Sequence, residues 1–266
     1  MTASEAWLDT IETWVATFDE IAPGALEGLY VVGSAALSDW QPTSDLDIVA
    51  ITAEPADEEL AGTLLTAHAV FTERRPGTTV DGPFLAWGDL IVAPQGVTRP
   101  WTLDGAFHHD AECFEINPIT WHTLATFGQR IRGPKAADIP IPDDPTDRVR
   151  FVIDNAMSYW RGVRTELRGA LSELSASDTL PSSVPQWCLL GTCRMLYTAS
   201  TGTVTSKSGA GRWAAGVLDE TNRDVCRDVV ALRQRAEEPV SRDLLARAEL
   251  AMGDALRRIA VFADER

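Results

Sequence analysis

The stretch from Val31 to Thr52, VVGSAALSDWQPTSDLDIVAIT, constrains the fold more than any other part of the chain. It joins two apolar, β-branched runs, Gly28–Val32 and Asp45–Thr52, which predict two buried strands. Side chains alternate along a strand, so Asp45 and Asp47 lie on one face while their apolar neighbours point into the core. Two carboxylates side by side repel each other, and the arrangement is unfavourable unless a cation holds them.

A divalent cation and a phosphate group together fit this stretch. Oxygen ligands on a rigid strand suit Mg²⁺, which takes one or two carboxylates and completes its shell with water and substrate phosphates. Gly33 lets the backbone come close to a phosphate, and the hydroxyl and amide of Ser34 can donate to it. The pattern therefore predicts a site for one or two Mg²⁺ ions. A turn followed by a strand with a solvated acidic face is the alternative.

The charge of the chain narrows the class of partner. Lys and Arg number 23 against 39 Asp and Glu, which gives a net charge of −16 over 266 residues. Such a surface repels nucleic acid and anionic lipid and attracts cations. We therefore expect neither a nucleic-acid nor a membrane partner, and a positively charged small substrate is favoured. Acidity that serves solubility alone is the alternative.

The sequence shows no targeting signal and no transmembrane segment, which predicts a cytoplasmic protein. Residues 1–20 are acidic and lack the basic start of a signal peptide, and no apolar stretch is long enough to cross a bilayer. The four cysteines have no CxxC spacing and no histidines at zinc-ligand offsets. They are interpreted as small buried side chains in a reducing compartment.

The length of the chain and a change in its character predict two domains, 1–143 and 144–266. Four prolines interrupt regular structure between Gly133 and Pro145, which we interpret as a linker. The first part mixes helix and strand signals, and the second is helical throughout. We expect an α+β fold, with a mixed sheet and flanking helices followed by a bundle of about five helices. Helices are expected over Ser4–Ile21, Glu58–Phe71, Trp121–Phe127, Arg148–Leu174, Trp187–Thr201, Ser208–Val217, Asn222–Ala236 and Val240–Phe262, with further strands over Thr78–Leu85 and Phe114–Ile116.

Two motifs carry a resemblance to known enzymes. The strand, Gly-Ser turn and Asp-x-Asp strand of Val31–Thr52 resemble the signature of the polymerase-β-like nucleotidyltransferases. Cys193–Trp213, CRMLYTASTGTVTSKSGAGRW, resembles the helical domain of the aminoglycoside adenylyltransferases that modify streptomycin and spectinomycin. The resemblance implies that Arg194 and Lys207 reach the phosphates of a nucleotide. Without the resemblance, the favoured interpretation is that Arg194 forms an ion pair across the bundle and that Lys207 is solvated. Further nucleotide contacts implied by the resemblance are Gly33, Ser34, Ser44 and Asp138.

The resemblance also implies a third carboxylate that shares the metal site and acts as the general base on the acceptor hydroxyl. Asp81, in TVDGPFL, begins a strand at about the family spacing. Asp89 and Glu115 are the substitutes. Because Asp-Gly and Gly-Pro are turn signals, a purely structural turn at Asp81 is the alternative.

The acceptor is the least constrained part of the assignment. A stacking tryptophan of the family corresponds approximately to Phe107, and Leu180–Trp187 lacks the acids that the family places before the arginine-bearing helix. We expect Mg²⁺-dependent transfer of AMP from ATP to a hydroxyl of a small, cationic acceptor such as an aminoglycoside, with release of pyrophosphate. The alternatives are the same chemistry on another small molecule or a protein hydroxyl, and a non-catalytic nucleotide-binding regulatory module.

Overall fold

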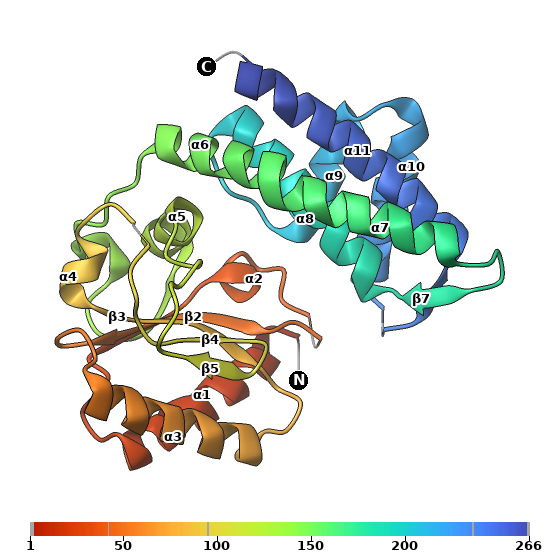
Figure 1. Ribbon diagram of the computed structural model, residues 1–266. Coiled ribbons are helices and arrows are strands. Elements are labelled where there is room, and N and C mark those ends of the chain that lie inside the picture. The colour runs from red at the N-terminus through yellow and green to blue at the C-terminus, as the bar shows by residue number, and fades with distance from the viewer. Residues whose placement is uncertain (1–2, 42, 95, 236, 265–266) are drawn as a thin grey trace. The chain divides into compact units, whose positions relative to one another are not determined.

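The computed structural model describes residues 3–41, 43–94, 96–235 and 237–264 (Figure 1). The chain divides into two compact units, Met1–Asp143 and Asp144–Arg266. The first combines a sheet with helices and the second is helical apart from a short two-stranded ribbon. The predicted α+β class is confirmed.

The first unit is built on a six-stranded mixed sheet with the order β5-β4-β3-β2-β1-β6. Only β2 and β3 run parallel, and α3, Glu58–Arg74, supplies the crossover that parallel neighbours require. The other neighbouring strands are antiparallel. The strands are β1 Gly28–Val31, β2 Leu46–Thr52, β3 Val80–Ala86, β4 Trp101–Leu103, β5 Ala106–His108 and β6 Gln129–Arg132.

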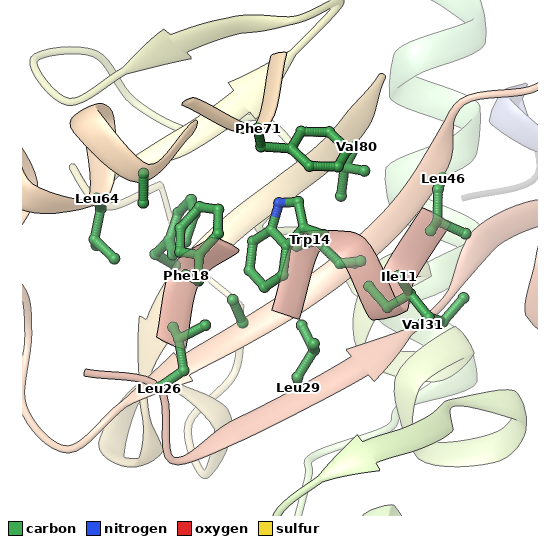
Figure 2. Packing of buried hydrophobic residues seen from close by; sticks show 14 of the residues in the cluster. Ile11, Trp14, Phe18, Leu26, Leu29, Val31, Leu46, Leu64, Phe71 and Val80 are labelled. Carbon is green, nitrogen blue, oxygen red and sulfur yellow. The ribbon is translucent and has the colours of Figure 1, made fainter. Parts of the chain in front are cut away.

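One face of the sheet is covered by α1, Ala3–Ile21, and α3 (Figure 1). In α1 the apolar side chains Ile11, Trp14 and Phe18 recur at helical spacing, and all three are almost completely buried. The rings of Trp14 and Phe18 stack with their centroids 3.8 Å apart. Figure 2 shows these side chains packed with residues of the strands and of α3. Burial of this apolar face is what holds the helix on the sheet.

The opposite face of the sheet carries a second apolar cluster, which includes Tyr30, Val49, Leu85 and Trp121. Strands that are buried on both faces explain why β1 and β2 are apolar almost without interruption. The short helices of this unit are α2 Gly33–Ala36, α4 Trp87–Leu90, α5 Pro118–Phe127 and the 3₁₀ turn η1 Ala136–Asp138.

The proline-rich segment after β6 packs on the first unit over most of its length. Ile139 and Ile141 contact the second cluster, and Asp143 accepts a hydrogen bond from Nδ1 of His122 at 2.9 Å. The hydroxyl of Tyr30 donates to the carbonyl of Pro134 at 2.8 Å. The expectation of a linker from Gly133 is therefore wrong up to Asp143, because apolar side chains between the prolines anchor the segment.

The second unit packs its helices around α8, Ser183–Thr201, which contacts most of the others. Asp144 caps α6 through the N–H of Thr146, and Gly202 ends α8 in the left-handed conformation. The single helix expected over Arg148–Leu174 is instead divided by a π-helical turn, η2. The remaining elements are α6 Pro145–Asn155, η2 Ala156–Trp160, α7 Arg161–Glu173, α9 Lys207–Val217, α10 Glu220–Leu232 and α11 Arg242–Asp264, with the ribbon strands β7 Thr179–Pro181 and β8 Pro239–Ser241.

Several expectations about local structure are corrected. Phe114–Ile116 forms a turn, not a strand, and α1 begins at Ala3, one residue before the expected start at Ser4. The four cysteines are free and buried. Within the described ranges, no helix combines the length and apolar character needed to cross a membrane.

Candidate active site

Asp45, Asp47 and Asp81 gather where β2 and β3 begin. Asp47 and Asp81 are direct partners in the parallel register of these strands. Alternation along each strand puts both carboxylates on one face of the sheet, and Asp45 shares that face two residues before Asp47. Leu46 and Val80, the preceding register pair, belong to the core on the opposite face. The strand register therefore brings Asp81 to Asp45 and Asp47, from which it lies far apart in sequence.

The Gly-Ser turn lies directly against Asp47. Gly33 has a φ of +57°, and a methyl group on its α-carbon would lie 1.7 Å from Oδ2 of Asp47. The backbone N–H of Ser34 donates to the same oxygen at 3.4 Å, and that of Val32 donates to the carbonyl of Asp47 at 2.9 Å. Only glycine allows both this conformation and this approach.

Asp81 is a buried carboxylate with one oxygen that accepts no hydrogen bond from the described residues. It is 1% exposed, and its Oδ2 accepts the backbone N–H of Asp104 at 3.0 Å. Its Oδ1 has no hydrogen-bond partner among the described residues. Burial raises the pKa of Asp81, the N–H of Asp104 opposes the shift, and the negative charge of Asp45 adds to it. A carboxylate in this state can take a cation or a proton.

Glu115 is the fourth acid of the cluster. Burial raises its pKa well above the ordinary value, and the charges of Asp47, Asp81 and Asp45 raise it further. It lies in the turn before α5, whose N-terminus is capped by the side chain of Asn117. One of the two substitutes for Asp81 thus joins the cluster beside it.

Asp89, the other substitute, is engaged elsewhere. Its carboxylate accepts hydrogen bonds from Nε and Nη2 of Arg99 at 2.9 and 2.8 Å and from the N–H of Ala86 at 2.8 Å. Burial alone would raise the pKa of Asp89, but Arg99 and the Ala86 N–H outweigh it and the pKa lies below its usual range. The contact with Ala86 caps the start of α4, and the three hydrogen bonds engage both oxygens of the Asp89 carboxylate away from the cluster.

The donor set fits a hard divalent cation. Four carboxylates share one region, two of them with raised pKa values, and Oδ1 of Asp81 is buried without a partner. Among the described residues, no three acidic, histidine or cysteine side chains converge into a ready-made metal site. An ion bound here would therefore have to complete its coordination shell with oxygen atoms of water or of a ligand.

The predicted phosphate contacts of the first unit are placed differently. Oγ of Ser34 is buried with no hydrogen-bond partner among the described residues, so it is available to a ligand. Oγ of Ser44 accepts the N–H of Gln41 at 3.2 Å, and Ser44 and Asp45 line a cavity of about 310 Å³. Asp138 is exposed in η1, and within the described ranges no hydrogen bond or ion pair joins it to the carboxylates.

Arg194 and Lys207 belong to the second unit. Arg194 lies on α8, and Lys207 is the first residue of α9, whose N-terminus is capped by the side chain of Ser206. The two helices pack on each other. Both side chains are partly exposed. Their contact with a nucleotide stays a prediction.

Phe107 contradicts its predicted role. In β5 it pairs with Thr102, and its ring packs against Phe84 and His68 at centroid distances of 5.8 and 6.0 Å. This is the α1 and α3 face of the sheet, opposite to Asp81. A one-residue difference in strand position turns a side chain to the other face, so an approximate correspondence could not place this ring.

Aromatic side chains other than Phe107 lie on the face of the sheet that carries the carboxylates. Trp101 and His108, a register pair next to Pro83, stack at 4.3 Å. The ring of Phe114 meets Trp101 edge-on at 4.9 Å and is 57% exposed. An exposed ring therefore lies next in sequence to Glu115, at the side of the cluster.

The turn that holds Asp81 is a feature the sequence interpretation missed. Asp104 and Gly105 join β4 to β5, and both have positive φ, +50° and +76°. An Asp-Gly pair between short apolar runs is a strong hairpin signal. The sequence TLDGAF contains this hairpin signal. The strands on either side of the turn are only three residues long, which is too short for their alternation to be recognised.

Comparisons with known proteins agree with this geometry. Residues 16–81 match the nucleotidyltransferase domain family, and residues 151–254 match the family described as the C-terminal domain of aminoglycoside adenylyltransferase. The fold is similar to that of spectinomycin adenyltransferase AAD(9) from Enterococcus faecialis, solved with ATP and spectinomycin. That similarity has a TM-score of 0.69 at 16% identity and covers 95% of this chain and 99% of the other. No curated protein sequence matches the chain.

Proposed function

Because the chain is a nucleotidyltransferase of the aminoglycoside-adenylyltransferase type, we propose that it transfers AMP from ATP to a hydroxyl of a small, cationic acceptor such as an aminoglycoside. The acceptor oxygen attacks the α-phosphorus in line, the bond to the β-phosphate breaks, and pyrophosphate leaves. The observation that carries the proposal is the contact between the Asp47 carboxylate and the Gly33-Ser34 turn. It supports the proposal because a carboxylate able to bind a cation lies next to backbone that can approach a phosphate.

The proposed metal ligands are Asp45, Asp47 and Asp81, which would hold one or two Mg²⁺ ions. A bound divalent ion neutralises phosphate charge and makes the α-phosphorus more electrophilic. Asp81 is the proposed general base, because its free Oδ1 and raised pKa suit it to accept the proton of the acceptor hydroxyl. The N–H that it receives from Asp104 fixes its orientation.

Phosphate binding is proposed for Gly33, Ser34 and Ser44 in the first unit and for Arg194 and Lys207 in the second. The buried, unpartnered hydroxyl of Ser34 supports the first assignment. The second rests on the sequence resemblance and on the preference of arginine and lysine for phosphate oxygens. Asp138 is kept as a weaker nucleotide contact on the resemblance alone.

A cationic acceptor is supported by the surroundings of the carboxylates. The carboxylate of Glu115 makes no hydrogen bond or ion pair with the other described residues, and its neighbour Phe114 exposes a ring. A carboxylate next to an aromatic face is a favourable environment for an ammonium group. The chain charge of −16 adds a long-range attraction for cations.

The test is pyrophosphate release from ATP and Mg²⁺ in the presence of streptomycin, spectinomycin, other aminoglycosides, unrelated small molecules and proteins. Asp47→Asn keeps the size of the side chain and removes its charge, so we expect turnover to fall by about 10²–10³-fold, the range typical for loss of one group that stabilises charge electrostatically. Asp224→Asn on the exposed face of α10 is the matched control and should keep full activity.

The outcomes separate the alternatives. Transfer to a protein or an unrelated metabolite would keep the chemistry and replace the acceptor. Binding of ATP without pyrophosphate release across the whole acceptor panel would indicate a regulatory module. Retained turnover in Asp47→Asn would reject the assigned site.

A further inference from the structure

A basic groove lies between α7 and α11 of the second unit, two helices that run side by side (Figure 1). Its volume is about 540 Å³, within the range of small-molecule sites. Four of its lining residues are arginines: Arg161, Arg164, Arg168 and Arg257. Such a concentration of guanidinium groups is unexpected in a chain with a net charge of −16.

Helical spacing accounts for the alignment of the arginines. Arg161, Arg164 and Arg168 follow at three- and four-residue steps, so they share one face of α7, and Arg257 faces them from α11. Two buried acidic side chains on α11 neutralise part of the positive charge of these arginines. Glu249 accepts Nε of Arg164 at 2.7 Å and lies 3.8 Å from Nε of Arg168, whereas Asp254 pairs with Arg257 at 3.3 Å.

Positive charge remains in excess in the groove. Arg161 makes no ion pair or side-chain hydrogen bond with the described residues, and the two Nη groups of Arg164 make none either. The side chains of Arg168 and Arg257 are 67% and 65% exposed. Guanidinium donors are therefore left over in a concave surface, where an anion can meet several at once.

Gly253 makes room for the central guanidinium. It lies in the interior of α11, a position where glycine is less favourable than alanine. A methyl group there would lie 2.3 Å from Nη2 and 2.4 Å from Cζ of Arg164. Arg164 thus lies flat against the backbone of α11 in a space that any other residue would fill.

We propose that this groove binds a small phosphorylated anion carrying at least two negative charges. Guanidinium forks match phosphate oxygens in pairs, and the surplus of donors calls for more than one anionic oxygen group. Leu256 and Ala260 add an apolar wall for the organic part of such a ligand. The net charge of −16 repels the long phosphate backbone of a nucleic acid, so a small molecule is favoured.

Isothermal titration calorimetry with inorganic pyrophosphate tests the site, in EDTA and at low salt so that the metal-dependent site is silent. The double variant Arg161→Gln/Arg168→Gln removes the two cations with the fewest partners and should weaken binding at least tenfold. Arg150→Gln/Arg227→Gln, an equal charge change at exposed ion pairs on α6 and α10, is the matched control and should bind like the parent. Arg194→Ala/Lys207→Ala should also keep binding, which separates the groove from the proposed nucleotide contacts.

Gly253→Ala gives an independent reading. The methyl group would lie 2.3 Å from Nη2, 2.4 Å from Cζ and 2.9 Å from Nε of Arg164, so it displaces the whole guanidinium group and pyrophosphate binding should fall several-fold. The helix keeps its fold because alanine is the more favourable residue in a helix interior. Circular dichroism and thermal unfolding verify that each variant is folded. The proposal is overturned if the parent does not bind pyrophosphate or if the control pair weakens binding equally. It is also overturned if Gly253→Ala binds like the parent, or if a short oligonucleotide displaces pyrophosphate at lower concentration.

Discussion

The α-carbon of Gly33 faces the carboxylate of Asp47 at a distance that leaves no space for a methyl group. Gly33→Ala combines this clash with a positive φ, so we expect a loss of stability of about 1–3 kcal/mol and a loss of turnover as Asp47 is pushed away. Urea unfolding and pyrophosphate release measure the two effects. Gly62→Ala, in the open interior of α3, is the control and should be neutral or stabilise by about 0.5–1 kcal/mol with full activity.

Asp81 links the site to the stability of the fold. Burial raises its pKa, so the folded protein favours the protonated form of the Asp81 carboxyl. The contribution of this protonation to the free energy of unfolding is fully present below the pKa of the unfolded chain. It is lost as the pH rises through the pKa of the folded protein. Asp81→Asn removes the titration and can still accept the N–H of Asp104. In EDTA we expect the variant to be more stable at pH 7, on the order of 1 kcal/mol, with the difference narrowing toward pH 3. Urea unfolding across this range checks it, and a less stable variant at pH 7 would contradict it.

At the scale of the element, the hairpin between β4 and β5 positions Asp81 through the backbone of its turn, where the N–H of Asp104 donates to the carboxylate. Gly105→Val puts a β-branched residue at a φ of +76° and should cost about 1–3 kcal/mol while lowering kcat, because the turn no longer presents Asp104 correctly. Gly24→Val has almost the same φ, +77°, in open space after α1. It should lose comparable stability and keep its kcat, so an equal loss of kcat in both variants would argue against a positioning role for the turn.

Long periodic segments were predictable, and short ones were not. The pattern of Ile11, Trp14 and Phe18 predicted α1, and the apolar runs predicted β1 and β2. By contrast, β4 to β8 span three or four residues each and, unlike the equally short β1, mix apolar residues with polar, charged or proline residues, so no continuous apolar run marks them. The turn at Phe114–Ile116 has the β-branched and aromatic composition of a strand, but tertiary contacts decide its conformation.

At the scale of the whole molecule, both apolar clusters of the sheet are complete within residues 1–143. We propose that this unit is a domain, and we expect the fragment 1–143 to unfold cooperatively in urea. A fragment ending at residue 132 loses Ile139, Ile141 and the Asp143 contact, so it should be less stable by about 2 kcal/mol. Equal stability of the two fragments would show that the proline-rich segment does not anchor the domain.

The sequence by itself determined the local chemistry of the candidate site. Gly33, Ser34, Asp45 and Asp47 lie within fifteen residues. Because strand alternation is a local rule, the shared face of Asp45 and Asp47 could be derived without any partner strand. The α+β class followed in the same way from the period of each segment.

Only the tertiary structure decided which distant residues join them. The parallel register puts Asp81 next to Asp47, and the turn before α5 brings Glu115 to the same cluster. Asp89 is instead held by its ion pair with Arg99. The same register turned Phe107 to the opposite face. These choices depend on strand pairing and loop packing between residues far apart in the chain, and a local pattern carries no information about register.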